Sequence, residues 1–301
     1  METNPNVNCN AKEYSNQKMF EIKRSGRERK INFFVVVELF RFLFYLWFIS
    51  ILVLSVITTV AFVEVDYKKI VKSFGGSINV CVYFDFPPFI YVMPALYSVF
   101  IIIAFLFIVA SIFRAWISKE ENKITANEFN FYLFAFCYFF LATIMVSITM
   151  AIQPDLEKPE TWIIHTLPFT NLVVALMLLH IAMTWFNLKV AWVELNGKRW
   201  LKITNCISLI IIVTTSVIKI VYHINSFGGL KQGENREVIS NGWMWEVKNE
   251  TIGAFFRVVD SIWMIFVLIF PMCQSGYLAW KKFDTHGIIV TIEDNRIAKI
   301  T

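Results

Sequence analysis

The chain has 301 residues, of which 57% are hydrophobic and only 17% charged, and its formal net charge is +5. Soluble domains are nearer one half apolar and one quarter charged, so this composition favours a membrane protein and argues against a soluble enzyme. The surplus of positive charge lies beside the apolar segments described next, where it is ordinary for a membrane protein, and no nucleic-acid partner is expected.

Six segments are each apolar enough to cross a hydrocarbon core of about 30 Å, which needs about 20 helical residues. The first is preceded by a long polar stretch and is longer than the core of a cleaved signal peptide, so it is predicted to be the first span. The sequence therefore predicts an all-α polytopic membrane protein with six transmembrane helices, approximately over residues 33–63, 88–113, 130–152, 165–188, 202–222 and 254–280.

The distribution of Lys and Arg predicts the orientation, because these residues are retained on the cytoplasmic side during insertion. Of the 28 Lys and Arg residues, 18 fall in the two tails and in the loops after spans two and four, and 7 fall in the other loops. Both termini are therefore predicted to be cytoplasmic. The predicted organisation is a disordered cytoplasmic tail (1–30), a membrane domain (31–283) and a second cytoplasmic tail (284–301), with lumenal loops at about 64–87, 153–164 and 223–253.

Two features of the last lumenal loop bear on its surroundings. Trp243 and Trp245 are candidates for lipid contact on the lumenal leaflet, since tryptophan favours the membrane interface, although the stretch is equally well explained as an insertion without a role. Asn249 begins a glycosylation sequon that adjoins the sixth span.

The sequence carries no motif for a metal, a cofactor or a common enzyme class. Of its five cysteines only Cys81 falls in a predicted lumenal loop, so no intramolecular disulfide is indicated. No Cys or His cluster has metal-ligand spacing, and no glycine-rich phosphate loop, GxSxG or HExxH is present. We therefore expect neither a metal nor a cofactor.

Charged residues inside spans are costly in hydrocarbon, so each is a functional candidate. Glu38 and Arg41 are three residues apart, as are Arg257 and Asp260. The two residues of each pair are neighbours on a helix. They either neutralise each other near the membrane interface or bind a charged lipid headgroup. Lys219 lies near the lumenal end of span five and is expected to extend to the membrane surface.

Two histidines lie in span four. His165 is at its predicted lumenal start, and His180 is about 22 Å further along the helix. Their spacing of 15 residues leaves them about 60° apart around the helix, so they share one face. His180 is expected either to make an interhelical hydrogen bond or to act in chemistry. His165 is better placed to meet lumenal water and is a candidate general base.

Several segments of the chain carry motifs that can be compared with known families. The first is GYLAWKKFDTHGIIVT (276–291), which resembles the exit of the last span in the post-GPI attachment to proteins factor 2 family, where the sequence reads AWWDF followed by a short turn and a hydrophobic strand. LHIAMT (179–184) places His180 on a family histidine, and the IIH that ends at His165 matches the opening of the fourth span. The family's entry into span five is similar to GKRWLKITNCIS (197–208). At the lumenal exit of that span, IVYHIN (220–225) places His223 on a family histidine. The family's first lumenal loop resembles CVYFDFPPF (81–89).

The resemblance covers most of the membrane domain but not residues 1–30 or about 229–248. Asp260 stands where a glutamate is expected, and FIYVMP (89–94) replaces a serine-rich segment.

The resemblance implies a multi-pass protein of the Golgi and endoplasmic reticulum membranes that acts in fatty-acid remodelling of glycosylphosphatidylinositol (GPI) anchors. In this process a lyso-anchor regains an acyl chain. The implied partners are the lipid of GPI-anchored proteins, membrane lipids and, if the chain is not itself an acyltransferase, a separate one. An acyl-transfer centre needs a base or nucleophile and a group that stabilises an oxyanion. The candidates for these roles are His165, His180, His223 and Asp260, and Arg257 is a candidate lipid contact.

Two other functions are weighed against this one. The runner-up is a regulator of autophagy or membrane sensing like the related DRAM proteins, although the AWKKF exit motif favours the first interpretation. A channel or transporter ranks last, because the spans lack matched broken half-helices and have few intramembrane charges.

Overall fold

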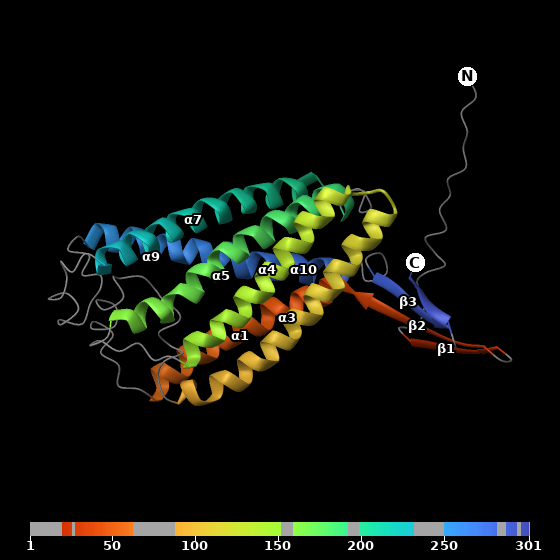
Figure 1. Cartoon of the computed structure of the whole chain (residues 1–301), viewed down its shortest axis with the longest axis horizontal. Helices are drawn as coiled ribbons and strands as arrows, with labels where there is room; N and C mark the ends of the chain where they lie inside the picture. The colour runs from red at the N-terminus through yellow and green to blue at the C-terminus, as the bar shows by residue number, and fades with distance from the viewer. Residues whose placement is uncertain are drawn as a thin grey trace, which may run out of the picture.

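The protein is an elongated bundle of membrane helices with a small antiparallel sheet at one end (Figure 1). It is described from a computed structural model, which covers residues 20–25, 28–62, 88–151, 159–191, 199–231, 250–281, 287–293 and 296–300. The sheet lies next to the beginning of the first helix and the end of the last (Figure 1). We call this end of the bundle the sheet end and the opposite end the far end.

Among the described residues, six helices are each long and apolar enough to cross a membrane, in agreement with the predicted number. Two of them contain a π-helical turn, η3 and η4. In chain order the elements are α1 (Val37–Phe62), α3 (Phe89–Glu120), α4 (Ala126–Ala151), α5 (Pro159–Phe186) with η3 (Asn187–Ala191), α7 (Arg199–Lys231), and α9 (Glu250–Met264), η4 (Ile265–Ile269) and α10 (Phe270–Lys281) as one continuous last span.

Several helices end well away from the predicted span limits. The second span was predicted to end at residue 113, but α3 continues to Glu120, so Arg114 lies in the helix and not in a loop. Hydropathy marks where a chain leaves hydrocarbon, whereas a helix continues as long as one face still has a neighbour to pack against. Ala115 and Ser118 supply that face, since both are buried.

The connection between α3 and α4 has clear local causes. Asn122 adopts a left-handed conformation with φ of 57°, which asparagine tolerates better than most residues, and α3 ends there. Thr125 and Glu128 then form a capping box. The Glu128 carboxylate accepts the Thr125 backbone N–H at 2.8 Å, and the Thr125 hydroxyl accepts the Glu128 N–H at 3.3 Å. These contacts start α4 immediately after the turn.

The sheet joins the two ends of the chain. Its strands are β1 (Phe20–Ser25), β2 (Glu28–Val36), β3 (Gly287–Glu293) and β4 (Arg296–Ile300), antiparallel and in that order. The sequence assigned 1–30 and 284–301 to tails and 33–36 to the first span, whereas the described residues of these ranges form strands. The central pairing, β2 with β3, arises only because α1 and α10 lie side by side and bring distant segments together. From Val37 to Lys281 the described residues are helical, as predicted, apart from Pro88 at the start of α3 and the short turn between α3 and α4.

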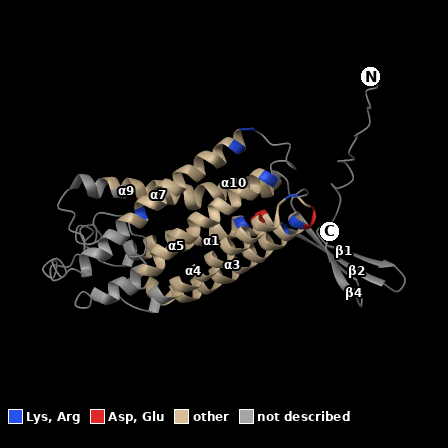
Figure 2. Ribbon diagram, turned by 45° about the horizontal axis from the view of Figure 1, so that its top comes forward, with Lys and Arg blue, Asp and Glu red and all other residues tan. Residues whose placement is uncertain are grey.

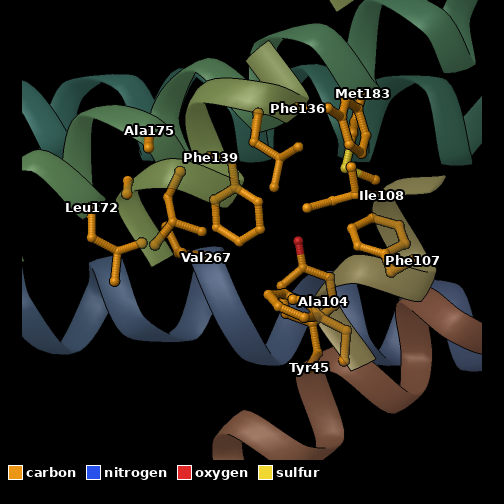
Figure 3. Packing of buried hydrophobic residues seen from close by; sticks show 14 of the residues in the cluster. Tyr45, Ala104, Phe107, Ile108, Phe136, Phe139, Leu172, Ala175, Met183 and Val267 are labelled. Carbon is orange, nitrogen blue, oxygen red and sulfur yellow. The ribbon is translucent and has the colours of Figure 1, made fainter. Parts of the chain in front are cut away.

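The core is built from aromatic rings packed against small residues. In lipid, helices associate mainly by close van der Waals packing, which small side chains permit. Phe44, Phe107 and Phe139 are almost fully buried, and alanines with 0% exposure, such as Ala104 and Ala175, lie among the rings. Figure 3 shows side chains from α1, α3, α4, α5 and η4 meeting in this cluster.

Charged residues of the described helices are concentrated at the sheet end, and the helix bodies between the two ends carry very few (Figure 2). A charge that does lie inside this apolar body is therefore easy to identify, and its partners can be followed in detail.

Candidate functional site

A buried ionic group lies at the sheet end of α1. Glu38 accepts from Arg41 Nη1 at 3.5 Å and from Arg114 Nη1 of α3 at 3.3 Å. The side chains of Glu38 and Arg41 are only 5% and 4% exposed. The predicted pairing of Glu38 with Arg41 is confirmed, and the structure adds Arg114, so the carboxylate is shared by two guanidinium groups on different helices.

Arg41 links this group to three side chains deeper in the bundle. Its Nη2 donates to Gln274 Oε1 of α10 at 3.3 Å, and its Cζ lies 6.0 Å from the centre of the Tyr45 ring. The Tyr45 ring is in turn stacked on His180 of α5, with the ring centres 6.3 Å apart and an angle of 28° between the planes. We call Arg41, Tyr45, His180 and Gln274 the buried polar site. Their exposed fractions run from 0% to 6%, so all four are withdrawn from lipid and from water.

His180 also makes the interhelical hydrogen bond that was expected of it. Its partner is the backbone of Val267, in the π-helical turn η4. Four residues after Val267 comes Pro271, which has no N–H and cannot donate to the carbonyl of residue 267 as a regular helix requires. The imidazole N–H supplies the missing donor, in the way that neighbouring helices satisfy backbone groups freed by proline in membranes.

Four polar atoms of the buried polar site have no hydrogen-bond partner. Among the described residues, the buried side-chain nitrogen and oxygen atoms in this condition are Arg41 Nε, Tyr45 Oη, His180 Nε2 and Gln274 Nε2. All four belong to the residues just defined. Since His180 Nε2 is unpaired, the bond to Val267 uses Nδ1, and in the neutral ring Nε2 is then an acceptor. The other three atoms carry donor hydrogens.

A second polar group lies toward the far end, between α7 and α9. Lys219 forms an ion pair with Asp260 at 2.5 Å, and its ammonium group lies 4.3 Å from the centre of the Trp263 ring. Trp263 Nε1 donates to Ser216 at 2.9 Å. The expectation that Lys219 extends to the membrane surface is wrong, because a carboxylate on the neighbouring helix holds it. Asp260 likewise has an interhelical partner.

The remaining predicted site residues are placed only in part. His165, His223 and Arg257 lie in α5, α7 and α9, but their side chains are outside the description, as are Trp243, Trp245, Asn249 and Cys81 altogether. A lumenal centre that combines the histidines with Asp260 therefore stays a prediction. Among the described residues, no group of three or more His, Cys, Asp or Glu is arranged to hold a metal ion.

Sequence reasoning identified Arg41 and His180 as candidates but did not identify Tyr45 or Gln274. Tyr45 lies four residues after Arg41, hence on the same face of α1, and Gln274 is an amide in an apolar span. These are weak signals, because tyrosine and glutamine are ordinary at membrane interfaces, and only the packing shows that both are buried beside a charge.

The buried polar site combines one hydrogen-bond acceptor with three donors, one of them on a cation, within an apolar bundle. Such a set can bind a polar group or can orient one for chemistry. Comparisons of the chain with protein-family models, with curated proteins and with solved structures found no match.

Proposed function

We propose that the protein is a factor in the fatty-acid remodelling of GPI anchors and acts in the reacylation of lyso-anchors in the Golgi membrane, with the endoplasmic reticulum as a second location. In this role it either transfers the acyl chain itself or presents the anchor lipid to a separate acyltransferase. Both termini face the cytoplasm, an orientation supported by the distribution of Lys and Arg along the chain.

One observation carries the proposal. Two segments that resemble the remodelling family, LHIAMT in α5 and the exit segment that begins at Gly276 in α10, are far apart in the chain. His180 from the first segment bonds to the backbone of Val267, and Gln274, two residues before the second segment, belongs to the same buried polar site. One resembling segment supplies His180 to the buried polar site and the other begins two residues after Gln274, which is more specific support than apolar spans alone.

The experiment is a rescue in cells that lack the protein, with the acyl composition of GPI anchors measured by mass spectrometry. We expect lyso-anchors to accumulate, anchored proteins to be shed, and both effects to be reversed by the wild-type chain. The His165→Ala and His180→Ala variants are expected to fail at normal abundance. Tyr97→Phe is the matched control, because it removes a buried hydroxyl that bonds to the Thr143 carbonyl, outside the buried polar site.

One result would contradict the proposal, and another would contradict only the role given to the histidines. An unchanged anchor profile in the cells that lack the protein would contradict the remodelling function itself. If loss does alter the profile but the histidine variants rescue as well as Tyr97→Phe, the function would stand and these histidines would be packing residues only.

A further inference from the structure

The unpaired atoms of the buried polar site call for an explanation. In native proteins the great majority of buried side-chain polar atoms have a partner, and those without one usually face an ordered water, an ion or a ligand. Here the unpaired atoms are not scattered over the molecule. They occur on neighbouring residues of α1, α5 and α10, each of which is at least nine-tenths buried.

Arg41 carries the positive charge of this group and is poorly paired for a buried charge. A buried guanidinium is costly unless it is paired and hydrogen-bonded, and charge-assisted bonds are normally about 2.7–2.9 Å long. Arg41 has instead one contact of 3.5 Å to a carboxylate that also serves Arg114 and one of 3.3 Å to a neutral amide. Its Nε has no partner. A water molecule would accept from Nε but would leave the positive charge as poorly balanced as before.

We propose that the buried polar site binds a phosphate that retains an O–H, either the phosphate monoester of phosphatidic acid or the free phosphate ion. Arg41 Nε, Tyr45 Oη and Gln274 Nε2 donate to its ionised oxygens, and arginine is the side chain best suited to phosphate. His180 Nε2 accepts from the remaining O–H, which a monoester has and a phosphodiester lipid lacks. The proposal does not depend on anchor remodelling, since it concerns binding alone.

The first test compares ligands on the full-length protein in detergent by thermal unfolding. Dioleoyl phosphatidic acid is expected to raise the unfolding temperature, and dioleoyl phosphatidylglycerol, an anionic diester, is expected to raise it much less. Inorganic phosphate is the third arm. A shift with phosphatidic acid alone identifies a lipid as the ligand, and a shift with both identifies the free ion as sufficient. No shift with either, or an equal shift with phosphatidylglycerol, overturns the proposal.

Conservative variants then locate the effect. Tyr45→Phe removes one hydrogen bond to a charged group, so about tenfold more phosphatidic acid should be needed for the same shift. Gln274→Glu places a carboxylate beside Arg41, which should stabilise the protein without ligand and abolish the response to phosphatidic acid. Tyr97→Phe is the control that should respond like wild type, because its hydroxyl already donates to the Thr143 carbonyl at 2.7 Å. Wild-type responses in both Tyr45→Phe and Gln274→Glu would show that the lipid binds elsewhere and would overturn the proposal.

Discussion

At the scale of single residues, intramembrane charges connect helices. Lys219 of α7 pairs with Asp260 of α9, and Glu38 of α1 pairs with Arg114 of α3. A charge in a span is costly alone and acceptable when paired, so each of these contacts specifies which helix lies next to which. The aromatic and alanine packing around them is less selective, because many apolar pairings are nearly equivalent in lipid.

The Lys219–Asp260 pair should behave as a unit. Asp260→Leu leaves the ammonium group of Lys219 partly buried and unpaired, and the loss of stability should lie at the low end of the range of about 3–5 kcal/mol known for fully buried pairs. The side chains of Lys219 and Asp260 are 15% and 12% exposed, which moderates the cost. Lys219→Leu combined with Asp260→Leu should recover most of it. Unfolding in detergent measures both, and equal losses in the single and double variants would show that the pair is not coupled.

At the scale of elements, Pro271 explains why the last span is irregular. It lies two residues after the end of the π-helical turn η4, where the Phe270 N–H bonds to the Ile265 carbonyl instead of following the regular helical pattern. The same proline leaves the Val267 carbonyl without its helical donor, and His180 takes that place. The irregularity of one helix is thus matched to a polar side chain on another.

This coupling predicts a result for a double-mutant cycle. His180→Leu should cost about 1–3 kcal/mol in the wild-type background, because the Val267 carbonyl is left buried and unpaired. In a Pro271→Ala background, residue 271 can donate to that carbonyl within the helix, so His180→Leu should cost less by about 1 kcal/mol. Thermal or denaturant unfolding of the four proteins gives the coupling energy. Additive effects would mean that His180 and Pro271 act independently.

The capping box at the start of α4 gives a second prediction at this scale. Thr125→Ala removes the hydroxyl that accepts the Glu128 N–H, and the expected loss is about 0.5–2 kcal/mol. Thr58→Ala is a suitable control, because its hydroxyl donates to carbonyls within its own helix, at Leu54 and Ser55, and caps no helix start. The same unfolding measurement applies to both variants. A loss for Thr58→Ala as large as that for Thr125→Ala would remove the capping explanation.

At the scale of the whole molecule, the sheet ties the first and last spans together outside the bundle. β2 continues directly into α1, and β3, which follows α10, pairs with β2 so that Val36 lies opposite Gly287. The six-helix arrangement permits this geometry, because an even number of spans returns the chain to the side where it began.

The orientation of the whole molecule can be tested in sealed microsomes. Single cysteines at Arg24 and Arg296, introduced into a chain freed of its native cysteines, should react with a membrane-impermeant maleimide from the cytoplasmic side. A cysteine at Lys68, in a predicted lumenal loop, should react only after the membrane is permeabilised. The opposite pattern would invert the predicted topology, and reaction of all three positions in intact microsomes would contradict a six-span arrangement.

The sequence alone was sufficient for the features that depend on local physics. Each span must be apolar over the thickness of the membrane whatever its neighbours are, so six spans could be predicted from hydropathy. Glu38 and Arg41 are three residues apart on one helix, so their pairing followed from helix geometry.

The tertiary structure alone decided which helices meet and therefore which polar groups form a site. In lipid the outward faces of helices are as apolar as the inward ones, so periodicity does not show which face meets which neighbour. Arg41 and Gln274 are 233 residues apart, and Lys219 and Asp260 are 41 apart, and no local pattern connects either pair. The same holds for β2 and β3, whose pairing depends on the contact between α1 and α10. Close packing between distant segments, which hydropathy does not encode, brings Arg41, Tyr45, His180 and Gln274 together.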